Sequence, residues 1–176
     1  MRKALAVVFV LGLTAWASTA WCQLATVDFL AGKTVDVGNV EVGIADGDGD
    51  GYADDLCALV TMENDWELTE VHYMAWVVDP AGMQPVPGKW PVAEYAPPAS
   101  DSGLLLLVPD VTPGTYYVAV QGEVQLEIWT DLDQDGEVDE GEVTIQYESA
   151  WGAGNRFRTA RKGWWPTYFS VVVPEP

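Results

Sequence analysis

Alternation of apolar and polar residues on both sides of an acidic segment is the feature that most restricts the fold of this chain. Before the segment, 123-EVQLEIW-129 places every second residue, from Val124 to Ile128, on an apolar face, and 143-VTIQYE-148 repeats the pattern after it. A two-residue period is that of a β-strand, whose side chains point alternately to opposite faces of a sheet. The acidic segment is therefore predicted to join two antiparallel strands as a hairpin.

The joining segment, 131-DLDQDGEVDEGE-142, matches the twelve-residue calcium loop of an EF-hand. Calcium binds six to eight oxygen atoms, which such a loop supplies from positions 1, 3, 5, 7, 9 and 12. Here these positions hold Asp131, Asp133, Asp135, Glu137 through its backbone carbonyl, Asp139 and Glu142. Gly136 at position 6 permits the sharp turn that the loop needs. A solvated acidic turn is the alternative interpretation.

A second acidic segment, 46-DGDGDGYADDLC-57, repeats the first part of this spacing between the alternating residues before it and an apolar run, 56–62. Its first five ligand positions hold Asp46, Asp48, Asp50, Tyr52 through its carbonyl, and Asp54. Position 12 is Cys57, a poor calcium ligand because calcium prefers oxygen. We expect Asp55 to supply the last carboxylate, which is similar to the loops of dockerins and thrombospondin type 3 repeats. A flexible Gly-rich turn is the alternative.

The rest of the chain has the pattern of short strands separated by turns. Further strands are expected at 67–78, 103–108, 115–121 and 167–173, and turns at 79–82, 85–88, 97–103, 110–114 and 151–154. Regular strands with Gly and Pro turns and no helical stretch indicate an all-β fold, an antiparallel β-sandwich of immunoglobulin-like or jelly-roll-like type, with a barrel as the alternative. Since no long linker is present, residues 23–176 are expected to form a single domain.

The N-terminus has the pattern of a secretory signal peptide, which we place at residues 1–22. Two basic residues precede an apolar run, 4–13, which is too short to span a bilayer, and small residues follow it. We therefore expect a secreted protein, extracellular, periplasmic or at the cell surface, without a stable membrane anchor. Cleavage after Ala20 would leave Cys22 and Cys57 able to form a disulfide, whereas cleavage after Cys22 would leave Cys57 alone.

The net charge of -19 comes from 27 acidic residues against 8 Lys and Arg. Twelve of the acidic residues lie in the two acidic segments, so much of the negative charge is concentrated where oxygen ligands for calcium are predicted. A charge of this sign and size repels nucleic acid and anionic membranes. Nucleic acid is therefore not expected as a partner.

The few basic residues gather in 155-NRFRTARKGWW-165, next to two tryptophans. An exposed indole from Trp164 or Trp165 beside Arg161 and Lys162 could stack on a sugar ring. These four residues are thus a candidate site for an extracellular polysaccharide or a cell-surface component. The alternative is that the indoles pack in the core or at its rim and the basic loop pairs with nearby carboxylates.

No catalytic arrangement stands out. His72, the single histidine, lies in 70-EVHYMAW-76 on the same strand face as Glu70 and Trp76. A Glu–His pair could serve acid–base chemistry, but a strand histidine bonded to its neighbour is the favoured interpretation. No Ser lies in a nucleophile elbow, no His or Cys cluster has zinc spacing, and no pair of carboxylates is singled out for glycoside hydrolysis. We expect a protein that is not an enzyme.

Five segments together resemble a recurrent module of secreted bacterial proteins of unknown function. They are 31-AGKTVDVGNVEV-42, 66-WELTEVHY-73, 88-GKWPVAEY-95, 148-ESAWGAGNRF-157 and 163-GWWPTYFSVVV-173. The resemblance covers nearly all of the chain after the signal peptide and implies that the two acidic loops are insertions into hairpins of an existing scaffold. The last residues, 173-VPEP-176, resemble the start of a PEP-CTERM sorting signal, without the apolar helix and basic tail that would follow.

These features predict a secreted, calcium-binding structural or surface module in which calcium stiffens two β-hairpin loops. A calcium-dependent carbohydrate-binding or adhesion module is the alternative. The switching of an EF-hand sensor is not expected, because it requires a pair of helices that opens, and strands flank both loops here.

Overall fold

The structure, a computed structural model, describes residues 21–94, 102–132, 135–137, 139, 141–160 and 165–175. Its strands are β1 (Cys22–Ala31), β2 (Val35–Ala45), β3 (Asp55–Met62), β4 (Trp66–Trp76), β5 (Val92–Glu94), β6 (Ser102–Val108), β7 (Gly114–Trp129), β8 (Val143–Gly152), β9 (Asn155–Arg156) and β10 (Thr167–Val173). Two short 3-10 helices, η1 (Pro80–Gly82) and η2 (Pro87–Lys89), lie between β4 and β5. Within these described residues, no helix is long and apolar enough to cross a membrane.

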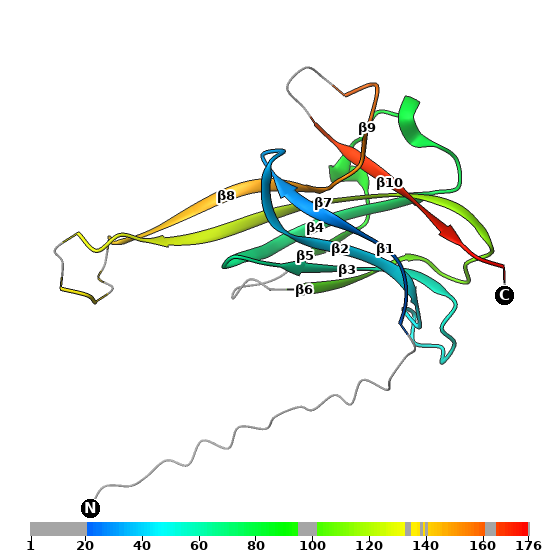
Figure 1. Cartoon of the computed structure of the whole chain (residues 1–176), viewed down its shortest axis with the longest axis horizontal. Helices are drawn as coiled ribbons and strands as arrows, with labels where there is room; N and C mark the ends of the chain where they lie inside the picture. The colour runs from blue at the N-terminus through cyan, green and yellow to red at the C-terminus, as the bar shows by residue number, and fades with distance from the viewer. Residues whose placement is uncertain are drawn as a thin grey trace, which may run out of the picture.

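All strand pairs are antiparallel, and the main path through the sheet runs β5-β4-β7-β8-β1-β2-β3-β6. The long strand β7 pairs with β10 along its first part and with β8 along its second. The two halves of the path are joined through β1 and β8, which pair over Phe29–Ala31 only. The predicted all-β, antiparallel, sandwich-like fold is confirmed, with its two halves belonging to one open sheet (Figure 1).

The main core takes fully buried side chains from both halves of the sheet, including Val40 and Val60 from one half and Val120 from the other. The halves approach closely at Gly122 in the middle of β7. A Cβ atom there would lie 2.8 Å from Cζ of Phe29 and 3.0 Å from Cδ1 of Leu68. Because protein interiors are close-packed, only glycine fits at this contact without displacing a neighbour.

A second, smaller cluster lies on the opposite face of β7. Successive strand residues point to opposite faces, so Val118 and Val120 face the main core while Ala119 faces this second cluster. There Ala119 packs with Ala81 from η1, Phe157 and Tyr168. The connection between β4 and β5 therefore covers one end of the outer face of the sheet.

The β7–β8 hairpin extends beyond the body of the sheet and carries the segment 131–142 at its tip (Figure 1). Several large apolar side chains along this arm are exposed, among them Trp129 at 47 % and Tyr147 at 66 %. The other acidic segment connects β2 to β3. Each acidic segment therefore connects two antiparallel strands as a hairpin, as predicted.

Three details of the predicted strand order differ in the structure. The expected strands 115–121 and 123–129 are one continuous strand, β7, which runs through Gly122. Strands β1, β5 and β9 were not predicted from the pattern. Of the predicted signal peptide, residues 1–20 lie outside the described part of the chain, and Cys22 already pairs with Ile44 as the first residue of β1.

The disulfide allowed by cleavage after Ala20 does not fit this sheet. Cys22 and Cys57 are both free, on strands β1 and β3 that lie on either side of β2. Two spacings of about 4.8 Å between neighbouring strands separate them by roughly 10 Å, beyond the limit of about 7 Å between the Cα atoms of a disulfide. Cys57 is instead a buried apolar residue of the core edge.

Candidate functional site

The segment between β2 and β3 gathers three carboxylates. Oxygens of Asp46, Asp48 and Asp50 lie within 4.8 Å of one another, with Asp48 and Asp50 exposed and Asp46 partly buried. This is the one group of three or more metal-binding side chains found among the described residues. Carboxylate oxygens at this separation match what a hard cation such as calcium prefers.

Backbone hydrogen bonds hold these carboxylates in the turn. Oδ2 of Asp46 accepts the N–H of Gly51 at 3.1 Å, and Oδ1 of Asp50 accepts the N–H of Tyr52 at 2.8 Å. Asp48 accepts the N–H of Asp50 at 3.0 Å. Gly51 has a φ of +98°, a conformation that favours glycine, at the place where the spacing predicted the sharp turn.

The segment between β7 and β8 repeats this pattern at equivalent positions. Oδ2 of Asp131 accepts the N–H of Gly136 at 3.1 Å, and Oδ1 of Asp135 accepts the N–H of Glu137 at 2.8 Å. The two segments thus share their hydrogen bonds from position 6 to position 1 and from position 7 to position 5. Asp133, the predicted ligand at position 3, lies outside the described residues.

Asp55 is a buried carboxylate, only 1 % exposed, at the end of the first segment. Its Oδ2 accepts the N–H groups of Gly47 at 2.7 Å and Asp48 at 2.9 Å, and its Oδ1 accepts the N–H of Asp110 at 3.0 Å. Three amide donors satisfy this buried charge without a cation. Asp55 therefore fastens the start of the segment and the chain after β6 to β3.

Glu142, at position 12 of the second segment, makes corresponding contacts and is 5 % exposed. Its Oε1 accepts the N–H of Leu132 at 2.7 Å, and its Oε2 accepts the N–H of Asp139 at 3.0 Å. The indole Nε1 of Trp129 lies 3.4 Å from the same Oε2. The last carboxylate of each segment thus binds backbone amides inside its own loop.

Asp110 is a neighbour of the first segment that sequence spacing did not find. It follows β6, has a φ of +48°, and donates its N–H to Asp55. The N–H of the next residue, Val111, binds the carbonyl of Asp54 at 2.7 Å. Partial desolvation raises the pKa of Asp54 above its usual value, and the negative charges of Asp50 and Asp110 add to the effect. No local motif reveals this acidic neighbour, because strand pairing brings it in.

The structure separates the predicted ligands of the first segment into two sets. Asp46, Asp48 and Asp50 come together, whereas Asp54 and Asp55 are not members of that group. The side chain of Tyr52 is 68 % exposed, which is compatible with a role for its carbonyl alone. The three clustered carboxylates are therefore the best-formed part of the candidate metal centre.

Of the predicted sugar-binding residues, Trp165 is the one that the structure describes, since Trp164, Arg161 and Lys162 lie outside the described ranges. Trp165 lines a cavity of about 370 Å³ together with Leu30, Lys33, Ala153, Gly154, Arg156 and Thr167. Two basic side chains in one cavity are notable in a chain with so few of them. The cavity combines an indole with positive charge, but its basic residues are Lys33 and Arg156 and not the predicted Arg161 and Lys162.

His72 makes the neighbour contact that the strand pattern favours. Its Nε2 binds Oε1 of Glu70, two residues away on β4. Its Nδ1 is buried and has no hydrogen-bond partner.

Comparison of the chain with family models, curated proteins and solved structures gave no match.

Proposed function

We propose that this chain is a secreted, non-enzymatic calcium-binding module in which calcium stiffens two β-hairpin loops. The observation that carries the proposal is the group formed by Asp46, Asp48 and Asp50, whose oxygens lie within 4.8 Å of one another. Calcium binds carboxylate and carbonyl oxygens, and the carbonyl of Tyr52 follows the group at the spacing of an EF-hand loop. The second segment supports the proposal because Asp131 and Asp135 make the same backbone hydrogen bonds.

The electrostatics of the loops favour a divalent cation. Clustered carboxylates repel one another, and the net charge of -19 adds to this repulsion. Calcium sites of extracellular modules have dissociation constants of about 0.1 to 1 mM. At millimolar calcium and a constant of about 0.1 mM, each site would stabilise the fold by about 1.4 kcal/mol. That is a useful contribution for a domain of ordinary stability, and it calls for no change of conformation.

Thermal unfolding with calcium and with chelator tests the proposal. We expect calcium to raise the melting temperature, and we expect the triple variant Asp46→Asn, Asp48→Asn, Asp50→Asn to lose part of that rise. A control with Asp28→Asn, Asp65→Asn and Glu175→Gln makes the same charge change at exposed acids outside both loops and should keep the full response. Equal melting temperatures in calcium and chelator for the unmodified protein would reject the proposal.

A second candidate function is calcium-dependent carbohydrate binding or adhesion. The cavity that Trp165 forms with Lys33 and Arg156 favours it, since an indole offers a stacking face and two cations attract an acidic sugar. A glycan array probed in calcium and in chelator tests this function. Trp165→Ala should abolish binding if it is correct and should leave the thermal response to calcium unchanged.

A further inference from the structure

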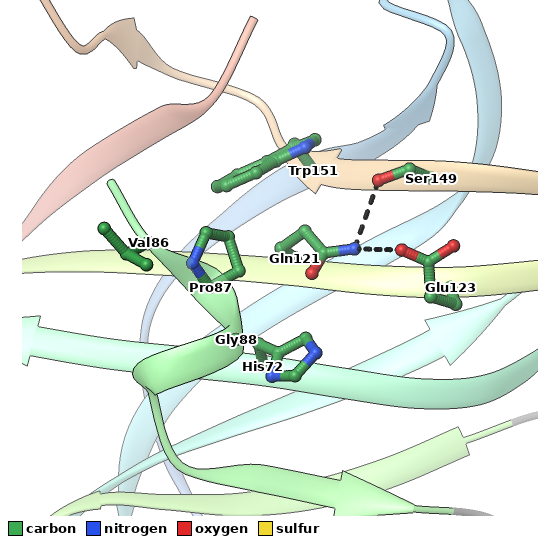
Figure 2. Close-up of a pocket in the computed structure, with 8 residues that line it drawn as sticks. All are labelled: His72, Val86, Pro87, Gly88, Gln121, Glu123, Ser149 and Trp151. Carbon is green, nitrogen blue, oxygen red and sulfur yellow. Dashed lines mark hydrogen bonds between the residues drawn. The ribbon is translucent and has the colours of Figure 1, made fainter. Parts of the chain in front are cut away.

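A hollow of about 470 Å³ lies on the outer face of the sheet, beyond the second cluster (Figure 2). Its floor consists of side chains from three neighbouring strands: His72 from β4, Gln121 and Glu123 from β7, and Ser149 and Trp151 from β8. The segment 86–88, around η2, forms one wall. Cavities of a few hundred cubic ångströms are of the size that holds small ligands.

The sheet register explains why these residues converge. Across β4, β7 and β8, His72 stands opposite Gln121, and Gln121 stands opposite Trp151. In the adjacent row, Glu123 stands opposite Ser149. Residues paired across neighbouring strands point to the same side of a sheet, so the five side chains form one surface.

Gln121 is the fixed centre of this surface and is only 4 % exposed. Its Nε2 lies 3.0 Å from the carbonyl oxygen of Gly122, 2.8 Å from Oε1 of Glu123 and 3.1 Å from Oγ of Ser149, and its two N–H groups are shared among these three acceptors. Figure 2 shows its Oε1 turned away from Glu123 and Ser149. These bonds hold the side chain in place, so its carbonyl oxygen is a preorganised acceptor in the hollow.

The polar atoms left over define the ligand chemistry. The lining offers the Gln121 carbonyl, the Glu123 carboxylate and the Ser149 hydroxyl. No Lys or Arg is among the residues that line the hollow, so an anion would find no positive partner there.

A sugar residue satisfies these conditions better than a simple cation. The acceptors come from β7 and β8 and lie along a hollow of about 470 Å³, which is much larger than one ammonium group. A pyranose carries several hydroxyl donors around one ring, and its apolar edge suits the wall made by Val86 and Pro87.

The surface continues from the hollow along the β7–β8 arm. Trp151, Ser149 and Tyr147 share one face of β8, and Tyr147 is 66 % exposed. The same face leads on through Ile145 to Val143, about 26 Å from Trp151 at a rise of about 3.3 Å per residue. An exposed aromatic ring next to a polar hollow suits a chain of sugars rather than a single one.

We propose that the hollow and the adjoining face of β8 bind a neutral polysaccharide. One sugar lies in the hollow, where Gln121, Glu123 and Ser149 bind its hydroxyls, and the next sugars lie against Tyr147. This inference goes beyond both candidate functions, because it names a neutral glycan and a surface separate from the calcium loops and from the basic cavity of Trp165.

The test is a titration of intrinsic tryptophan fluorescence with four soluble hexasaccharides: three neutral β-linked ones, of glucose, mannose and xylose, and one anionic, of galacturonate. We expect saturable binding of at least one neutral hexasaccharide. Glu123→Gln, which keeps the acceptor for Gln121 but removes the charge, and Tyr147→Ala should each weaken it by about tenfold. Val172→Ala, an exposed residue of β10 outside this surface, should leave the affinity unchanged.

Two results would overturn the inference. One is the absence of binding by all three neutral hexasaccharides up to about 10 mM, the weak end of measurable affinities. The other is binding that Trp165→Ala abolishes while Glu123→Gln and Tyr147→Ala leave it intact, which would support the basic cavity alone. Repeating the titration in calcium and in chelator measures the affinity for the glycan separately from the response to calcium. A failure of glycan binding can therefore be distinguished from a failure of calcium binding.

Discussion

Asp55 and Glu142 make the same hydrogen bond in two loops that lie far apart in the sequence, although Asp55 is at position 10 of its loop and Glu142 at position 12. Each is a buried carboxylate that accepts, at 2.7 Å, the backbone N–H of the second residue of its loop, Gly47 for Asp55 and Leu132 for Glu142. Each therefore holds the start of its loop close to the strand that follows. The candidate calcium ligands are arranged around these two internal anchors.

Replacement of Asp55 by Asn tests the anchoring role. Asn keeps one acceptor oxygen but loses the charge that three amide N–H groups share, so we expect the free energy of unfolding to fall by about 1 to 3 kcal/mol. Urea denaturation in chelator measures the effect without a contribution from calcium. Asp65→Asn, at an exposed acid, serves as the control. An unfolding midpoint equal to that of the unmodified protein would show that Asp55 does not anchor the loop.

Trp129 should report on the second loop. Its Nε1 lies 3.4 Å from Oε2 of Glu142, so calcium binding that recruits this carboxylate must change the surroundings of the indole. We expect a saturable change of tryptophan fluorescence on addition of calcium, largely removed by Trp129→Phe. The triple Asn variant of the first loop should retain it. Retention of the full signal in Trp129→Phe would contradict a calcium site at Glu142.

The stability of the fold is expected to fall even when Gly122 is replaced by alanine, the smallest possible substitution. A methyl group at this position would lie 2.8 Å from the ring of Phe29, so Gly122→Ala should destabilise the fold by about 1 to 3 kcal/mol through overpacking. Gly82→Ala is the matched control, because a Cβ there meets no atom within 4 Å. Denaturant midpoints of the two variants measure the difference. Equal midpoints would mean that the two halves of the sheet are not packed at this contact.

Cys57 should be unreactive in the folded protein and should make stability depend on alkaline pH. Burial, with the negative charges of Asp55 and Asp46, raises the pKa of its thiol to about 11, from an ordinary value of 9.0. A raised pKa means that the folded state keeps its proton longer than the unfolded state, so its contribution to stability is present below pH 9 and is lost as the pH rises through 11. Disulfide-exchange labelling at pH 8 should modify the exposed Cys22 rapidly and Cys57 only after unfolding. Equal rates for both thiols would contradict the burial of Cys57.

The sequence predicted strands from a two-residue period or from a continuous apolar run. The period marks β2, β8 and β10, and apolar runs mark β3 and β6. Strand β1 escaped prediction because its start overlaps the apolar N-terminal segment and two irregularities, at Gln23–Ala25 and Phe29–Leu30, interrupt its pairing with β2. The strands expected at 115–121 and 123–129 form one strand, in which Gly122 is required by the contact with Phe29.

The candidate sites likewise contain some residues that the sequence could predict and others that it could not. Ligand spacing within a loop is local, so Asp46, Asp48 and Asp50 could be chosen from the sequence. Asp110 could not, because its hydrogen bond to Asp55 spans 55 residues and depends on the pairing of β3 with β6. The hollow at Gln121 likewise depends on the register of three strands. A single sequence does not specify such a register.

Calorimetric titration of the chain from residue 21 onward with calcium tests the central claim most directly. We predict two sites for the unmodified protein, one after Asp46, Asp48 and Asp50 are changed to Asn, one after Asp131 and Asp135 are changed to Asn, and none when both sets are combined. A single site that is lost when Asp131 and Asp135 are changed, and kept when Asp46, Asp48 and Asp50 are changed, would show that the first loop does not bind calcium. The absence of any calcium-dependent heat, together with an unchanged melting temperature, would contradict the account.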